Sequence, residues 1–377
     1  MRNLFLMLSL LCCGAAFAKS DETAIVAHQR AKLTAGAENG RDRHLLLEAG
    51  GRQFALTLAP NDALLANVDA DVRNGANGGG NEFLAGTIDG VGGSWARLSR
   101  VGGQWTGAIY DGKELLLVDP VEKVRGKLRQ PVAAGTDLVA YRLSDLHVPD
   151  RVDGIVTPIS YGELVAPEVA AAAAATKQLE LSVVTDADFA AIHGGNANAV
   201  VASRINTIDG IYSAQVGVQV VASSVRALSS NGTLTSTNSS TLLEAFRVMV
   251  AGGQVPRGDV THLMSGKDFD GSTVGVAYIG VICNQSYGVG INQIRDASQA
   301  TALTMAHEMG HNFGAPHDGE GACVGVTNPG IMNPFINGST TFSSCSLTQM
   351  ADDVAAAACL APVTGGGAPL IYANGFE

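Results

Sequence analysis

Residues 307–318 read HEMGHNFGAPHD and hold three of the eight histidines of the chain. On a helix, His307 and His311 project from one face about 6 Å apart, so both imidazoles can bind one zinc ion at about 2.0–2.1 Å. Glu308 is rotated from His307 by about 100° and can reach a water activated by the metal without being a ligand itself. The spacing predicts a catalytic zinc site on a helix.

His317 can join this site only if the helix ends before it. On a continuous helix, His317 would lie roughly 15 Å along the axis from His307. Gly314 tolerates the left-handed conformation at a helix end, and Pro316 prevents the helix from resuming. We therefore predict a turn at Gly314 that returns His317 to the metal.

The helix that carries the motif is expected to begin well before His307. Residues 297–306 are compatible with a helix, and Asp296 followed by Gln299 resembles a capping box. A bare H-E-x-x-H pattern often marks an ordinary helix with solvated ends. The longer pattern fixes six residues, roughly a 20⁻⁶ coincidence per starting position, so a zinc site is favoured over an ordinary helix.

The motif resembles that of the metzincin zinc peptidases, H-E-x-x-H-x-x-G-x-x-H. Asp318 directly after the third histidine is similar to the adamalysin or reprolysin branch, which includes the snake-venom metalloproteases and the ADAM proteins. This resemblance implies a Met-turn below the zinc, and the sequence PGIMNP at 329–334 contains Met332. It also implies general-base catalysis by Glu308, three zinc ligands and three supporting residues: His307, His311 and His317; Gly314, Asp318 and Met332.

The composition limits the partners of the chain. Its 377 residues, 46% of them hydrophobic, are enough for two domains of ordinary size. A net charge of −11 argues against nucleic acid and against anionic membrane surfaces as partners. We expect protein or peptide substrates and a monomer.

The first eighteen residues indicate export. Arg2 precedes a short apolar core, and Ala16–Ala18 is an A-x-A cleavage site, so residues 1–18 are expected to be a signal peptide and the mature chain to start near Lys19. Lipid attachment at Cys12 or Cys13 is the less favoured alternative. No other stretch is apolar for long enough to span a bilayer, so we expect a secreted or periplasmic protein without a stable membrane anchor.

Four cysteines follow the signal peptide. An even number in an exported chain predicts two disulfides, and their spacing leaves all three connectivities open. The resemblance to adamalysin-like domains implies the pairs Cys283–Cys359 and Cys323–Cys345. Cysteine ligation of zinc is less favoured, because three histidines already supply a catalytic set.

Residues 19–176 are predicted to form a β-rich, propeptide-like domain. Residues 43–48 and 54–58 are strand candidates, and further strands alternate with glycine turns over 83–120, a pattern that resembles the prodomain of adamalysin-like proteases. This region contains no cysteine, so a thiolate cannot block the zinc. A permanent accessory domain is the alternative. The alanine run at 170–175 marks the expected boundary, and the basic residues at 123–129 offer an earlier processing site.

Residues 177–364 alternate strands and helices, which indicates an α/β fold. Strands are predicted at 179–185, 216–221 and 259–264, and helices at 199–212, 242–250 and 347–359. The resemblance implies a metzincin, or zincin-like, catalytic domain with a mixed sheet, the zinc-binding active-site helix and an edge strand at 274–279 over the cleft. This strand either pairs with an extended substrate or is an ordinary edge strand with small residues, and the sequence favours neither. A pocket wall is expected near 335–345. We expect His262 to be a core residue and residues 365–377 to be a disordered tail. Glu180 and Asp259 could hold a structural calcium ion, although the asparagine expected after Cys359 is missing.

These features together predict a secreted zinc endopeptidase that hydrolyses peptide bonds with a water activated by zinc and Glu308. A catalytically silent binding protein or adhesin with a metzincin shell is the alternative. The intact Glu308 argues against it, because non-catalytic relatives usually lose this residue.

Overall fold

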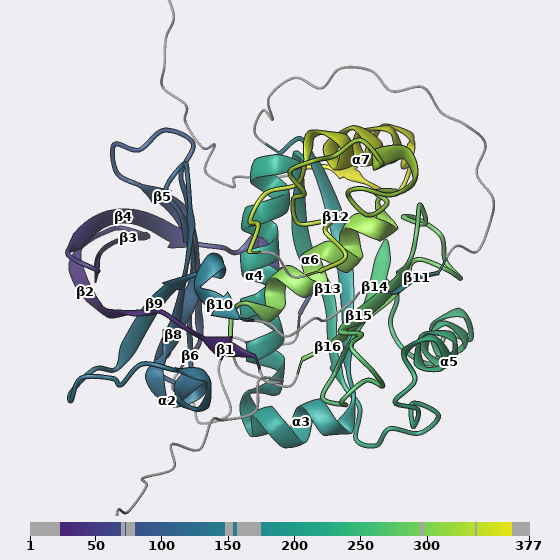
Figure 1. Cartoon of the computed structure of the whole chain (residues 1–377), viewed down its shortest axis with the longest axis horizontal. Helices are drawn as coiled ribbons and strands as arrows, with labels where there is room; N and C mark the ends of the chain where they lie inside the picture. The colour runs from purple at the N-terminus through teal and green to yellow at the C-terminus, as the bar shows by residue number, and fades with distance from the viewer. Residues whose placement is uncertain are drawn as a thin grey trace, which may run out of the picture.

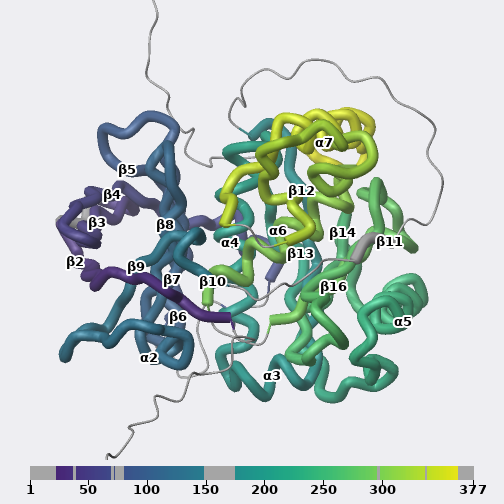
Figure 2. The backbone as a smooth tube through the Cα atoms, viewed as in Figure 1, coloured from purple at the N-terminus to yellow at the C-terminus, as the bar shows by residue number. Residues whose placement is uncertain are grey.

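The computed structural model describes residues 23–68, 72, 80–147, 154–156, 175–294, 298–335 and 338–363. The expected signal peptide, most of the alanine run, Asp296 and the expected tail lie outside these residues. Figures 1 and 2 show a barrel of strands on one side of the long helix α4 (Ala197–Gln215) and a sheet with further helices on its other side.

The N-terminal part of the described chain is a closed barrel of antiparallel strands. Alternate side chains point inward, as Phe54, Leu56 and Leu58 do, and together they fill the interior. Closure leaves this barrel without a free strand edge. The predicted β-rich region is thus confirmed, and its strands are β2 (Gln29–Asn39), β3 (Asp42–Ala49), β4 (Arg52–Pro60), β5 (Glu82–Ile88), β6 (Trp95–Val101), β7 (Gln104–Tyr110), β8 (Leu115–Pro120) and β9 (Leu138–Arg142).

The second part is a mixed sheet in the order β11-β15-β16-β14-β12-β13, with β17 paired to β12. β15 runs antiparallel to β16 and β17 runs antiparallel to β12, whereas the other pairs are parallel. Separately, β1 (Ala24–Ile25) pairs with β10 (Leu146–His147). The strands of the sheet are β11 (Gly154–Val156), β12 (Lys177–Thr185), β13 (Val218–Ala227), β14 (Val260–Ser265), β15 (Gly275–Tyr278), β16 (Val289–Gln293) and β17 (Ala361–Pro362).

Helices cover both faces of this sheet. Alternation along β12 turns Leu181 and Val183 towards α4 and α6, and Val184 towards α5. The helices that the structure describes in full also include α2 (Val121–Val124), α3 (Ala187–His193), α5 (Ser239–Ala251), α6 (Thr301–Asn312) and α7 (Ser344–Ala356), with short 3-10 turns η1 (Ala63–Leu65), η2 (Arg125–Lys127), η3 (Leu143–Asp145), η4 (Gly194–Asn196) and η5 (Gly321–Cys323).

Two disulfides hold the C-terminal segments. Cys283 is bonded to Cys359, and Cys323 to Cys345, which are the pairs that the family resemblance implies. None of the helices among the described residues is long and apolar enough to cross a membrane.

The start of α6 differs from the prediction. The helix begins at Thr301, and its N-cap residue, Ala300, offers no side-chain cap. The capping box is wrong because Gln299 bonds elsewhere. Its amide nitrogen donates to Ser203 Oγ at 2.8 Å, and its amide oxygen accepts from Thr207 Oγ1 at 3.0 Å, both on α4.

The cleft edge of the sheet also differs from the prediction. β16 was not predicted, and it lies between β14 and β15. β15 is not outermost, because β11 pairs with it in parallel, with Gly154 opposite Val276 and Val156 opposite Tyr278. The expected free edge at 274–279 is therefore covered by residues from the N-terminal region.

A buried hydrogen-bond cluster joins the barrel to the residues before α6. The Asp119 carboxylate accepts from the Tyr141 hydroxyl at 2.7 Å, from Thr106 Oγ1 at 2.8 Å and from the Gln299 backbone N–H at 3.1 Å. The Tyr141 hydroxyl also lies 2.5 Å from Ser298 Oγ. Burial raises the pKa of Asp119 to about 6.

We expect Asp119→Asn to change how stability depends on pH. A carboxyl with a folded pKa of about 6 and an unfolded pKa of about 3.9 stabilises the fold below pH ~4, and this contribution is lost as the pH rises through 6. Between pH 4 and 7 the unfolding free energy of the wild type should fall by roughly 2 kcal/mol more than that of the variant. Urea unfolding at both pH values measures this difference, and equal falls would contradict it.

Candidate active site

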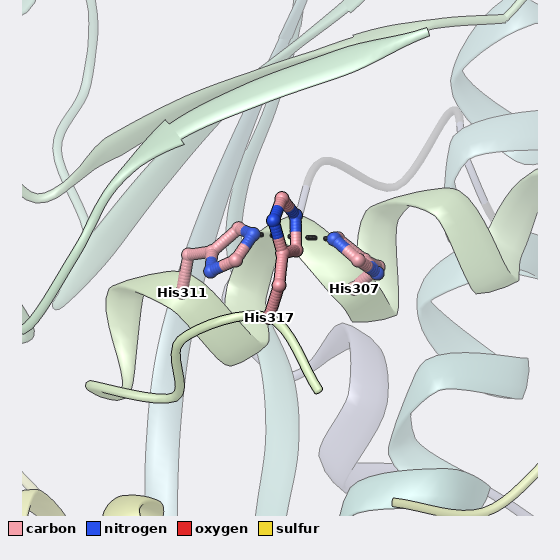
Figure 3. Close-up of side chains that lie close together, drawn as sticks. All are labelled: His307, His311 and His317. Carbon is pink, nitrogen blue, oxygen red and sulfur yellow. Dashed lines mark hydrogen bonds between the residues drawn. The ribbon is translucent and has the colours of Figure 1, made fainter. Parts of the chain in front are cut away.

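Three imidazoles meet beside α6. His307 and His311 lie one turn apart on this helix, and His317 returns to them from the loop that follows (Figure 3). All three side chains are buried, and their ligand nitrogens lie within 4.8 Å of one another. Within the described ranges, no other group of three His, Cys, Asp or Glu side chains is placed to hold a metal ion.

The predicted turn brings His317 back. Gly314 has a φ of +90°, the left-handed region that favours glycine. Its N–H donates to His311 O at 2.8 Å, and the Ala315 N–H donates to Gly310 O at 3.0 Å, which closes the end of the helix. The chain then reverses before His317.

Hydrogen bonds fix the orientation of each ring. His307 Nδ1 lies 2.6 Å from Ile331 O, and His311 Nδ1 lies 2.7 Å from Ala315 O. His317 Nδ1 lies 3.3 Å from Glu320 Oε2. Because carbonyl and carboxylate oxygens only accept, each Nδ1 donates its proton, which leaves Nε2 as the atom of each ring that can bind a metal ion.

These Nε2 atoms fit a zinc ion. His307 Nε2 and His311 Nε2 face each other at 3.1 Å. Two nitrogens bonded to one tetrahedral zinc ion at about 2.0–2.1 Å lie about 3.3 Å apart. The residues present therefore fit the metal that the motif predicts.

Glu308 lies beside the triad and is fully buried. A Cβ atom added to Gly275 on β15 would overlap Glu308 Oε1, so only glycine leaves room for this carboxylate. Beneath the helix, the Tyr212 hydroxyl donates to Ala306 O at 2.8 Å. Burial and the charge of Glu308 raise the pKa of Tyr212 well above its usual value, which keeps this donor neutral.

The Met-turn packs against the same helix. Met332 is fully buried, and a Cβ atom on Gly310 would overlap its sulfur. Asp318 connects this turn to α7. Its backbone N–H donates to Met332 O at 2.9 Å, and its carboxylate accepts from Gly330 N, Ser343 Oγ and Ser346 Oγ at 2.5–2.8 Å.

We expect Gly310→Ala to destabilise the protein by about 1–3 kcal/mol, because the added methyl group must displace Met332 from a packed site. Thermal unfolding measures the loss. Gly126→Ala is the matched control, since a Cβ atom there meets nothing within 4 Å. If both variants unfold at the wild-type temperature, Gly310 is not the close contact that holds the Met-turn.

His262 is a core residue, as predicted. Its ring is fully buried, and Nε2 lies 2.7 Å from Asn312 Oδ1. Asn312 uses its amide hydrogens on the carbonyl oxygens of Tyr278 and Val289, so its oxygen must accept from His262. Burial lowers the pKa of His262, and the neutral ring anchors the end of α6 to the sheet.

A pocket opens next to His307 and Glu308. The part of the chain after residue 177 contributes mainly apolar walls, from Leu303, Ile331, Pro334 and Phe335. Leu143 and Leu146, from the end of the barrel segment, line the same pocket. The residues near 335–345 that were expected to form a pocket wall thus include Phe335, Gly338 and Ser339, which line it.

The expected calcium ligands do not form a metal site of three such residues. Asp259 Oδ2 accepts from the Glu180 backbone N–H at 2.8 Å. Burial and the charge of Glu180 raise the pKa of Asp259 to about 6. Calcium binding is therefore not supported.

Several residues that shape the site were not predicted. Gly275 and Gly310 matter because of contacts with β15 and the Met-turn, and a lone glycine in the sequence does not reveal such contacts. Glu320 follows His317 by three residues, so a carboxylate at this spacing could have been recognised as a partner of the third histidine. Nothing in the sequence indicated that Leu143 and Leu146 line the pocket beside the three histidines.

The comparisons agree with this geometry. A reprolysin model, described as metallo-peptidase family M12, matches residues 175–359. The fold is similar to metalloproteinase-II from Bacteroides fragilis, with a TM-score of 0.51 and 16% identity over 82% of this chain and 90% of that chain. This share of the chain exceeds residues 175–359, so the similarity in fold extends into the N-terminal region. Residues 175–359 of this chain are therefore a reprolysin-like metzincin domain of metallo-peptidase family M12, a zinc-dependent peptidase family.

Proposed function

We propose that this chain is a secreted zinc endopeptidase, made with an N-terminal region that blocks its cleft. The observation that carries this proposal is the set of three buried imidazoles, His307, His311 and His317, whose Nδ1 atoms are held by oxygens. Glu308 lies beside them without being a ligand. The two disulfides support an oxidising compartment and thus export.

Different groups at the site have different roles in hydrolysis. Bound zinc would supply Lewis-acid activation of a water molecule and of the scissile carbonyl group. The Glu308 carboxylate takes a proton from the attacking water and delivers it to the leaving amine. Gly275 leaves space for this carboxylate, while Ile331 O and Ala315 O keep two of the three rings in the required tautomer. Peptide hydrolysis then needs no covalent intermediate.

The pocket and β15 would position the substrate. The apolar walls at Leu303, Ile331 and Phe335 favour an apolar substrate side chain next to the scissile bond. β15 offers backbone groups for pairing with an extended peptide. Val274, directly before β15, also lines the pocket, so strand pairing and pocket binding can act on one substrate.

The N-terminal region obstructs both positions. Leu143 and Leu146 line the pocket, and the segment around Ser144 lies against Gly338. β11 pairs with β15 at the edge where a substrate would bind. Because residues 19–176 contain no cysteine, latency rests on this obstruction rather than on a thiolate. This supports the interpretation of the region as a propeptide.

A casein-hydrolysis assay in solution tests the proposal. The untreated chain should be nearly inactive. Trypsin can cut at exposed basic residues of the barrel such as Arg125 and Arg129, and after its inhibition the chain should hydrolyse casein. A chelator should stop the reaction, and hydrolysis that survives the chelator would contradict a zinc mechanism. The absence of hydrolysis in every condition would favour the alternative, a binding protein or adhesin with a metzincin shell.

A further inference from the structure

Helix α4 is buried from both sides. It lies between the barrel and the sheet (Figure 1), and residues on all its faces are inaccessible to solvent. The face towards the sheet is apolar, with Ile205, Ile208 and Tyr212 in the core. The buried residues also include Asn206 and Asp209, polar groups that need partners in the absence of water.

The barrel provides those partners. Arg97 on β6 donates from Nε to Asp209 Oδ2 at 2.9 Å, and the two side chains are 8% and 2% exposed. The Asn206 amide donates to Leu84 O and Leu98 O of the barrel at 3.2 and 3.3 Å. Asn61 donates to Asn206 Oδ1 at 3.0 Å and to Asp209 at 3.4 Å. The polar groups of α4 and the barrel therefore match one another.

Apolar packing is continuous across the same contact. The Trp95 ring lies so close to Gly210 that a Cβ atom there would be 2.7 Å from it. Trp95 and Leu117 of the barrel belong to one hydrophobic core with Ile205 and Ile208 of α4. Interfaces of this kind, with an apolar centre and satisfied buried polar groups, are typical of permanent complexes.

Two further contacts hold the barrel segment to the protease part. The Asp119 and Tyr141 cluster bonds Ser298 and Gln299 before α6. β11 adds its backbone to β15. The contacts thus involve α4, the residues just before α6, and β15, and cutting the chain between β11 and β12 removes none of them.

We propose that the barrel stays bound to the face of α4 after the chain is cut between residues 157 and 175, and acts from then on as a separate subunit. Release then requires digestion of the barrel itself. A cut at the expected boundary alone leaves β11 and Leu146 over the cleft. The proposal concerns association and does not depend on peptidase activity.

The ion pair between Arg97 and Asp209 allows a test of whether the cut barrel stays bound to α4. Dissociation hydrates both Arg97 and Asp209, so the pair adds little net affinity, but removal of one partner leaves the other charge buried in the complex. Arg97→Met keeps the packing of the stem and removes the charge. It should raise the dissociation constant of the two fragments on the order of 10²-fold.

The experiment uses the full chain in a Glu308→Gln background, which prevents self-digestion, with residues 170–175 replaced by the recognition sequence of a site-specific protease. After complete cutting, checked on a denaturing gel, the fragments should co-elute in size-exclusion chromatography at the volume of the uncut chain. Dilution of labelled fragments gives the dissociation constant for the parent and for each variant. Two separate peaks from the cut parent at about micromolar protein would overturn the proposal.

Two further variants test whether α4 is the surface that binds the cut barrel. Arg100 lies on β6 like Arg97, and its side chain pairs with Glu82 on β5, where the two side chains are 37% and 35% exposed. Arg100→Met removes this pair and should leave the dissociation constant unchanged. Asn61→Ala, which removes two hydrogen bonds and no charge, should weaken the complex less than Arg97→Met and replaces it if that variant does not fold. An unchanged dissociation constant in both Arg97→Met and Asn61→Ala, or equal weakening by Arg100→Met, would overturn α4 as the docking surface.

Discussion

We expect Glu308→Gln to lower kcat/KM for peptide hydrolysis by at least about 10²-fold while the protein keeps its zinc. Glutamine has nearly the size of glutamate and fits beside Gly275, but its amide cannot accept the proton of the attacking water. The residue is not a ligand in our account, so metal content should not change. Measurement requires the trypsin-activated protein, with trypsin inhibited before a fluorogenic peptide is added.

Glu244→Gln is the control for this substitution. Glu244 lies on α5, across the sheet from the triad, where it pairs with Arg247. This variant should hydrolyse the peptide at the wild-type rate. Wild-type activity in Glu308→Gln would remove Glu308 from the mechanism, and loss of zinc from it would mean that Glu308 has a role in binding the metal.

His311→Ala should abolish activity, because the site then loses one of three zinc ligands. His311 is fully buried, and its Nδ1 is held by Ala315 O at 2.7 Å, so no neighbouring side chain replaces the missing nitrogen easily. Elemental analysis should find far less than one zinc ion per chain. Activity should fall to the background of the chelated wild type.

His193→Ala provides the comparison. His193 closes α3 and packs its ring on Phe189 at 4.3 Å, away from the triad. We expect this variant to keep both its zinc and its activity. A His311→Ala protein that holds one zinc ion per chain would show that the metal binds elsewhere.

The motif could be predicted from the sequence because its chemistry is local. The spacing of His307 and His311 is set by helix geometry, and the turn at Gly314 follows from its conformational freedom. The alternation of strands and helices after residue 177 was equally visible. The position of His317 then follows from these two elements.

Features that depend on distant contacts were not predictable. The local sequence predicts a capping box, but in the fold the side chain of Gln299 forms hydrogen bonds with Ser203 and Thr207 on α4 instead. Gly275 and Gly310 look like ordinary small residues, and their roles appear only when Glu308 and Met332 pack against them. Propensity describes the isolated segment, whereas tertiary contacts decide such cases.

The covering of the cleft edge is the clearest example. β11 is a three-residue strand far from β15 in the sequence, and nothing in its composition marks it as a partner. Closure of the barrel likewise depends on the pairing of β2 with β9. Pairings between distant strands leave little signal in either strand alone.

Stepwise return of zinc to the chelated, trypsin-activated protein tests the central claim most directly. Peptide hydrolysis should rise in proportion to bound zinc and reach its plateau at one zinc ion per chain, and the His311→Ala protein treated in parallel should recover nothing. Hydrolysis that persists without zinc, or that His311→Ala recovers to the wild-type level, would contradict a catalytic zinc site at His307, His311 and His317.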